Sequence, residues 1–199
     1  MVRYNPKRMK AKPEPCAATD ADDDSALMRR VAARDASAFR LLVERHGPRP
    51  HRIAWRMLGS SADAQDIAQE ALLRLWQQAG NWHGGGPGVA AWLTRVATNL
   101  CIDRLRARAR LSDEAPPERA DDAPLADVLL EGEQERAAVI AALDTLPDRQ
   151  RAAIVLTYYE DLANADAAAV LDMNIKAFES LLLRARRALK AMLVENGDG

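Results

Sequence analysis

The sequence has few cysteines, no long apolar run and almost no net charge, and each of these absences excludes a class of protein. Cys16 and Cys101 lie far apart, which argues against a disulfide framework and favours a reducing, cytoplasmic setting. No stretch approaches the roughly 18–20 apolar residues that cross a bilayer. The basic segment 1–12 lacks an apolar core, so it is not a secretory signal. We expect a cytoplasmic protein with no membrane insertion.

The sequence also lacks the groupings of residues that support catalysis. His46, His51 and His83 have no spacing that would hold zinc together with the two cysteines. No Ser/His/Asp set, Cys/His pair or phosphate-binding loop is present. These absences predict a protein that is not an enzyme and that uses no metal and no cofactor.

The near-neutral total charge of −1 hides a sorting of charge along the chain. Residues 25–110 carry 14 arginines and 6 acidic side chains, a balance of +8. Residues 111–135 carry one arginine and 9 acidic side chains, a balance of −8. A basic block followed by an acidic one predicts a domain that faces a polyanion, and then a solvated linker.

Apolar residues recur at helical spacing along most of the chain, and no β alternation is sustained. The clearest stripe runs from Ile67 to Ala79 and follows a capping Ser60 or Ser61. Two late helices surround a short turn at 172–174, which is a helix-turn-helix pattern. The expected helices cover residues 26–46 with a break near 33–36, 51–58, 61–79, 89–108, 133–143, 148–160, 165–171 and 175–194.

These patterns divide the chain into four parts and give an all-α fold class. Residues 1–24 hold three prolines and few apolar residues, and we expect a disordered N-terminal tail there. Residues 25–110 form one small helical domain and residues 136–195 form another. Residues 111–135, with most of the acid and a Pro-Pro pair, form a flexible acidic linker between them.

Four stretches resemble the bacterial RNA polymerase sigma factors of the sigma-70 family, in the short extracytoplasmic-function (ECF) group. The stretches are residues 38–46 (AFRLLVERH), 63–76 (DAQDIAQEALLRLW), 91–100 (AWLTRVATNL) with 103–106 (DRLR), and 142–151 (ALDTLPDRQR) with 184–189 (RARRAL). Their order and separations carry the resemblance. It implies sigma region 2 in the first domain and sigma region 4, a helix-turn-helix, in the second.

The resemblance implies that the helix containing residues 63–76 docks on the β′ clamp helices of core RNA polymerase, and that the second domain reaches the β flap. An acidic and polar stripe suits a basic helical partner, because charge complementarity sets orientation and association rate. The residues expected to bind core polymerase are Asp63, Asp66, Gln69, Glu70 and Arg74.

The family places recognition of the −10 promoter element on the loop at 80–89 and on the helix that follows. An unstacked base needs aromatic or apolar walls, and an amide or guanidinium reads base edges and phosphates. On that helix the apolar positions Trp92, Val96, Leu100 and Leu105 share a side, which leaves the polar residues for DNA. The residues expected at the −10 element are Trp82, His83, Arg95, Asn99, Arg104 and Arg106.

The resemblance also implies that the helix-turn-helix, about Asn164 to Leu183, reads the −35 element. The sequence departs from the family at two places: Asp172 stands where the turn usually has glycine, and Glu179 stands where the recognition helix usually has lysine. A carboxylate is repelled by phosphates but accepts a hydrogen bond from the cytosine amine. The residues expected at the −35 element are Lys176, Glu179, Ser180, Arg184 and Arg187.

The function that the resemblance implies is an alternative sigma factor. It would bind core RNA polymerase, direct it to specific −35/−10 promoters and promote DNA melting, and an anti-sigma protein is a further expected partner. Two alternatives stay open: a polymerase-independent helix-turn-helix regulator, and a sigma-like decoy that binds an anti-sigma protein.

Overall fold

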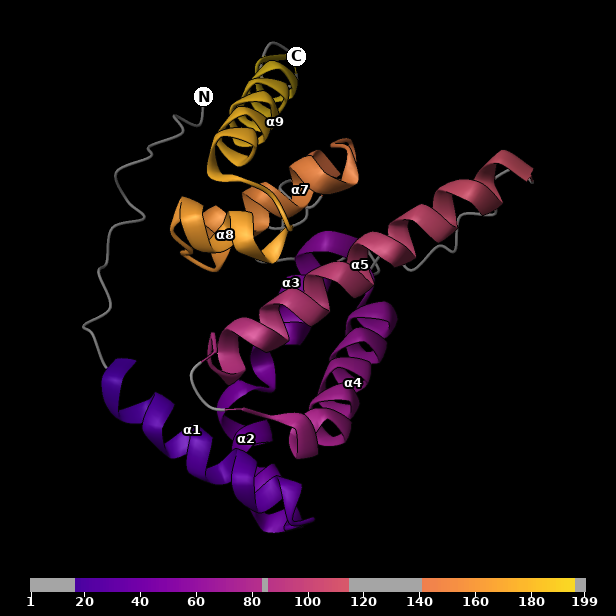
Figure 1. Ribbon diagram of the computed structural model, residues 1–199. Helices are drawn as coiled ribbons and strands as arrows, with labels where there is room; N and C mark the ends of the chain where they lie inside the picture. Colours follow the sequence, from indigo (N-terminus) through magenta and orange to yellow (C-terminus); the bar gives the residue numbers. More distant parts are fainter. Residues whose placement is uncertain (1–16, 84–85, 115–140, 196–199) are drawn as a thin grey trace, which may run out of the picture.

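The computed structural model describes residues 17–83, 86–114 and 141–195, and the regular elements in that part are all helical (Figure 1). The all-α expectation is therefore confirmed for the described part of the chain. The first domain contains α1 (Ala17–Ala32), α2 (Ala36–His46), α3 (Pro48–Leu58), α4 (Ser61–Gln78), the 3-10 turn η2 (Ala79–Asn81) and α5 (Val89–Glu114). The second contains α7 (Asp148–Ile154), the π-helical turn η3 (Val155–Tyr159), α8 (Asn164–Val170) and α9 (Ile175–Glu195).

Single local residues set the boundaries of the early helices. Asp35 caps α2, because its carboxylate accepts hydrogen bonds from two backbone N–H groups of the first turn. The Ser60 hydroxyl oxygen accepts from the N–H of Asp63 at 3.2 Å, which confirms the expected cap of α4. Gly59 ends α3 at φ 66°, a left-handed conformation that glycine adopts at low cost.

The helix α1 begins at Ala17, so the expected disorder is wrong for residues 17–24. Asp24 is a buried residue inside this helix. Its two carboxylate oxygens lie 2.5 Å from Arg45 Nη1 and 2.6 Å from His46 Nε2 on α2. This contact between helices fixes α1, and local composition does not reveal it. Residues 1–16 lie outside the described residues.

The helix α5 differs from its expected extent and from its expected buried face. It continues to Glu114, so the first four residues of the expected acidic linker are helical. The expected row of Trp92, Val96, Leu100 and Leu105 is only partly buried. Helices of both domains contact α5, so its buried face is wider than one amphipathic stripe. The fully buried positions include Leu93, Thr94, Ala97, Thr98 and Cys101.

The second domain contains the expected helix-turn-helix, formed by α8 and α9. Asp172 in the turn has a left-handed φ of 53°, and the Asn174 side chain caps α9 by accepting from the Ala177 N–H at 2.9 Å. The buried side of α9 is formed by Phe178, Leu181, Leu182 and Ala185. The linker beyond Glu114 and the expected helix up to residue 140 lie outside the described residues, and residues 141–144 are helical.

Two apolar clusters hold the described residues together, and one of them joins the two domains. The first cluster packs α1 and α2 against α4 and the start of α5. The second combines α3 and α5 residues such as Met57 and Ile102 with residues of the second domain such as Leu156 and Phe178. Accordingly, α7, α8 and α9 lie together on one side of α3 and α5 (Figure 1).

Candidate functional site

A groove of about 700 Å³ lies between α4 and α5, and its walls carry charges of both signs. It is lined by four of the five residues expected to bind core polymerase: Asp66, Gln69, Glu70 and Arg74. Glu70 and Arg74 form an i,i+4 ion pair, with 2.7 Å between Oε1 and Nε. Both side chains stay about half exposed, so a partner helix can reach their charges.

The fifth expected residue, Asp63, does not line the groove. Its side chain is only 13% exposed, and its Oδ1 accepts from Arg104 Nη1 at 2.8 Å. Arg108 binds the other carboxylate oxygen. The carboxylate also lies in the first turn of α4, where the helix dipole favours a negative charge. Asp63 therefore forms ion pairs that link α4 to α5.

The groove also contains residues that the sequence interpretation assigned elsewhere or missed. Arg104, expected at the −10 DNA, lines the groove, and its Nη2 is 4.0 Å from Asp66 Oδ2. Leu73 was missed, although it is a large apolar residue that is 50% exposed at the groove. The signal was present in the sequence, because Leu73 falls outside the apolar stripe of α4. Leu100, Asp103 and Ala107 complete the α5 wall.

The outer face of α5 brings together three of the residues expected at the −10 element. Arg95, Asn99 and Arg106 are all exposed, and their spacings of four and seven residues place them on one side of the helix. Arg95 Nη2 is paired with the carboxylate of Asp172 in the helix-turn-helix. This face therefore presents an amide and cations together, a combination that suits base edges and phosphates.

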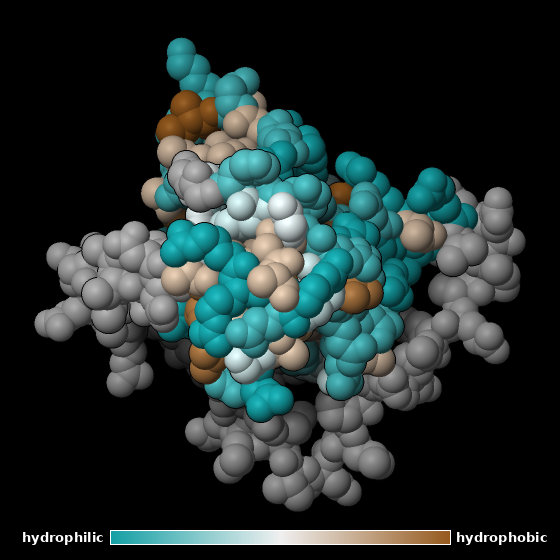
Figure 2. Space-filling view, turned by 60° about the horizontal axis from the view of Figure 1, so that its bottom comes forward, coloured by the Kyte–Doolittle hydropathy of each residue, from teal (hydrophilic) through white to brown (hydrophobic). Residues whose placement is uncertain are grey.

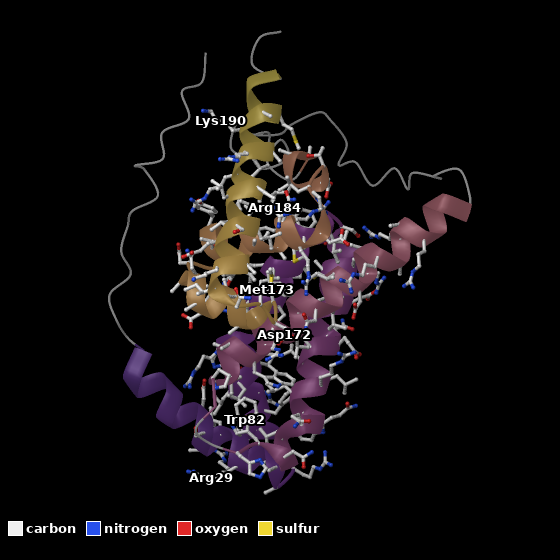
Figure 3. All side chains as sticks on the ribbon, turned by 45° about the horizontal axis from the view of Figure 1, so that its top comes forward. Arg29, Trp82, Asp172, Met173, Arg184 and Lys190 are labelled. Atoms are coloured by element: carbon white, nitrogen blue, oxygen red, sulfur yellow. The ribbon has the colours of Figure 1, made fainter. Side chains whose placement is uncertain are left out.

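The two loop residues expected at the −10 element differ in their environment. The ring of Trp82 packs edge-on against Trp92, with 6.2 Å between centroids, at the border of the first apolar cluster. His83 is exposed, and its Nδ1 lies 2.7 Å from the carbonyl oxygen of Asn81. Figure 3 shows Trp82 in the first domain, away from the labelled residues of α9. Residues 84–85 of the same loop lie outside the described residues.

All five residues expected at the −35 element are exposed on α9. They are Lys176, Glu179, Ser180, Arg184 and Arg187. Two apolar residues that the sequence interpretation missed, Ile175 and Leu183, are also nearly half exposed. Their spacing of four from Glu179 places the three on one ridge of the helix. Figure 3 shows Arg184 and Lys190 along the same helix.

The part of the chain that the structure describes offers no membrane span and no metal cluster. The face in Figure 2 is largely hydrophilic, with small separate apolar areas. No helix among the described residues is long and apolar enough to cross a bilayer. Within residues 17–83, 86–114 and 141–195, no three His, Cys, Asp or Glu side chains gather as metal ligands would.

Comparison with known families assigns both domains. Residues 42–111 match Sigma-70 region 2, and residues 136–189 match Sigma-70, region 4. The ECF RNA polymerase sigma factor SigM of Mycobacterium tuberculosis is 36% identical over 170 residues, which cover 85% of this chain and 84% of that protein. SigE of Mycolicibacterium smegmatis is 34% identical over 161 residues, 79% of this chain. The chain spans only 62% of the length of SigE.

Two solved structures share the fold. CnrH, in complex with the cytosolic domain of CnrY, is 30% identical with a TM-score of 0.65, over 87% of this chain and 99% of that one. The sigma factor RpoE of Bartonella quintana, in complex with the anti-sigma factor NepR, is 25% identical with a TM-score of 0.61, over 78% and 96%.

A helical region 2 followed by a helix-turn-helix region 4 defines the class of sigma-70 transcription regulators. Within that class, this chain belongs to the ECF sigma factors of bacterial RNA polymerase.

Proposed function

We propose that this chain is an alternative sigma factor that binds core RNA polymerase, directs it to specific −35/−10 promoters and promotes melting of the DNA. The observation that carries the proposal is the presence, in one chain and in the family's order, of region 2 with its polar groove and region 4 with its helix-turn-helix. The chain acts in the cytoplasm as a regulator, and the chemistry belongs to the polymerase.

Core polymerase binds at the groove between α4 and α5. Asp66, Gln69 and Glu70 offer negative and polar groups to a basic helix, and charge complementarity orients that helix. Leu73 supplies the apolar contact that such an interface needs at its centre. The β′ clamp helices are the partner of this groove, and region 4 contacts the β flap.

Promoter DNA binds at two separate surfaces. Asn99 reads a base of the −10 element, and Arg95 and Arg106 bind nearby phosphates, since all three lie on one exposed side of α5. Trp82 and His83 flank an unstacked base, although the packing of Trp82 on Trp92 leaves less of that ring free.

The −35 element binds at the exposed side of α9. Lys176, Arg184 and Arg187 supply cations for phosphates along that helix. Glu179 and Ser180 point to base edges, and the carboxylate selects a base that donates a hydrogen bond, such as cytosine.

An anti-sigma protein is a further partner of this chain. The two solved structures that share the fold both contain a bound protein, the cytosolic domain of CnrY in one case and the anti-sigma factor NepR in the other. The structural similarity covers most of this chain, including both domains. A comparable partner protein can therefore contact either domain.

Reconstituted transcription with core polymerase on a library of promoters tests the proposal. We expect salt-resistant open complexes on promoters that share a −35 and a −10 sequence. Failure to form such complexes on any promoter, with core binding intact, would favour a decoy that only binds an anti-sigma protein. Tight binding to duplex DNA without core polymerase would favour an independent helix-turn-helix regulator.

A further inference from the structure

Side-chain contacts at two places join α1 to α2. Midway along α1, the buried carboxylate of Asp24 lies 2.5 Å from Arg45 Nη1 and 2.6 Å from His46 Nε2, in the last turn of α2. Near the end of α1, Arg30 Nη2 lies 2.8 Å from Oδ2 of Asp35, the N-cap of α2. The end of each helix thus meets the other, so the two helices are antiparallel and α1 is held along α2.

The apolar face of α1 between and beside these contacts packs under the start of the −10 loop. Leu27, Met28 and Val31 are at most 4% exposed. They belong to the first apolar cluster together with Ala79 of η2 and Val89 at the start of α5. The helix α1 also lies directly against η2. Both ends of the loop between α4 and α5 are therefore anchored in a cluster that α1 helps to build.

The backbone that carries Trp82 and His83 continues directly from this supported turn. The Trp82 amide donates to the carbonyl oxygen of Ala79 at 3.2 Å, and its ring packs on Trp92 at the border of the same cluster. Figure 3 shows Arg29 of α1 and Trp82 at the same end of the first domain. The position of α1 therefore affects where the two loop residues stand.

The turn η2 needs such support because it is short. It has three residues, and a single 3-10 turn has little stability of its own. A Cβ placed at Gly80, its middle residue, would have no neighbour within 4 Å among the described residues. The turn is held instead through Ala79, which is buried in the same cluster as α1. A pocket that selects a base needs walls held to a fraction of an ångström.

We propose that α1 is a positioning element of the −10 base pocket and that Asp24 is its positioning residue. The contacts of Asp24 with Arg45 and His46 hold the apolar face of α1 against η2, and this sets the placement of Trp82 and His83 that decides which unstacked base is accepted. The inference rests on the proposed function, because the pocket belongs to it. The residues that match Sigma-70 region 2 begin at 42, so α1 precedes that match.

The first test measures base preference with Asp24→Ala. Open-complex yields are compared on four promoters that differ only in the unstacked −10 base, and the ratio of the best to the second base is taken. We expect this ratio to fall at least about threefold, because the pocket walls lose their fixed placement. A loss of global stability lowers the yield on all four promoters alike and leaves the ratio unchanged.

Two matched variants separate positioning from stability. Asp24→Asn keeps an oxygen that accepts from Arg45 and gains an amide that can donate to His46, so the ratio should return to that of the wild type. Ile53→Ala truncates a buried residue of α3 in the other apolar cluster. It should lower the melting temperature without changing the ratio. Circular dichroism at the assay temperature establishes that each variant is folded.

The second test needs neither polymerase nor DNA. Hydrogen exchange of the Trp82 amide, followed by NMR, reports the opening of η2. We expect this amide to exchange about tenfold faster in Asp24→Ala than in the wild type, and at the wild-type rate in Asp24→Asn. Val31→Ala shortens the apolar face but leaves the contacts of Asp24 in place, so it is the milder variant if Asp24→Ala does not fold. It should change both readouts in the same direction.

Wild-type base ratios and exchange rates in both Asp24→Ala and Val31→Ala would overturn the proposal. An equal change of the base ratio in Ile53→Ala would overturn it as well, because global stability would then explain the effect. If the wild type opens promoters but the variants keep its base preference, this inference alone fails. If the wild type opens no promoter at all, the proposed function fails and takes the base pocket with it.

Discussion

Arg151 on α7 donates a hydrogen bond to the carbonyl oxygen of Met57 at the end of α3, with 2.6 Å between Nη1 and the oxygen. The same guanidinium binds the Asp144 carboxylate and the Asp144 carbonyl oxygen, each at 2.7 Å. Burial lowers the pKa of Arg151, and the nearby Asp144 opposes that shift. One buried cation thus links the two domains and closes the turn before α7.

Replacing Arg151 should destabilise the protein. Arg151→Ala leaves two carbonyl oxygens without their donor, so we expect a loss of about 2–3 kcal/mol in the free energy of unfolding. Urea unfolding followed by circular dichroism measures it. Arg187→Ala, on the exposed side of α9, is the control and should change the free energy of unfolding by less than about 0.5 kcal/mol. Equal effects of the two changes would contradict this role of Arg151.

Charge reversal in the groove should weaken binding to core polymerase. In the variant Asp66→Lys/Glu70→Lys, the cation introduced at position 70 would stand beside Arg74, and the altered wall would repel a basic partner helix. We expect the Kd for core polymerase to rise about tenfold or more. Glu44→Lys/Asp166→Lys makes the same change in charge at exposed positions outside the groove and should leave the Kd nearly unchanged. Competition binding with labelled protein distinguishes the two variants.

Asn99→Ala should impair promoter opening while sparing core binding. Losing an amide that reads a base costs about 1–3 kcal/mol, so the yield of open complex should fall about tenfold on the preferred promoter. Permanganate footprinting of the melted strand measures the opening, and Gln65→Ala on α4 is the control. If Asn99→Ala lowered the affinity for core polymerase instead, the assignment of promoter reading to α5 and of core binding to α4 would be wrong.

Glu179→Lys should change the preferred −35 sequence. A lysine at this exposed position favours guanine acceptors and phosphates, whereas the native carboxylate accepts from cytosine. Selection of −35 sequences from a randomised library, with wild type and variant in parallel, gives the preference of each. Identical preferences would mean that residue 179 does not read bases.

Alkaline pH should destabilise the protein through Cys101. Burial raises the pKa of this thiol to about 12, above the ordinary value of 9.0. The folded state therefore holds the proton more tightly, so the stabilisation is complete below pH 9 and is lost as the pH rises from about 9 towards 12. This thiol makes the free energy of unfolding fall by at most about 1.4 kcal/mol more per pH unit. Urea unfolding between about pH 8 and pH 10.5 should show this extra slope in wild type but not in Cys101→Ala.

The expectations taken from local pattern agree best with the structure where short-range interactions decide. The expected Ser60 cap depends on groups three residues apart. Helical spacing likewise accounts for the Glu70–Arg74 pair and for the buried side of α9 around Phe178. The start of α1 was placed too late, because Asp24 is held by residues of α2 that lie more than twenty positions away. The buried face of α5 was misplaced for a similar reason, since helices of both domains contact it.

The sequence by itself determined the helical class, the order of two domains and the family, because hydrophobic periodicity and the motifs at residues 63–76, 91–106 and 142–151 are local properties of the chain. Only the tertiary structure decided which charges face outward. Asp63 and Arg104 bind each other, and the buried Glu160 is paired with Arg49 and Arg52 of α3. Periodicity assigns each side chain to one side of its helix, but the partner on that side depends on helices distant in sequence.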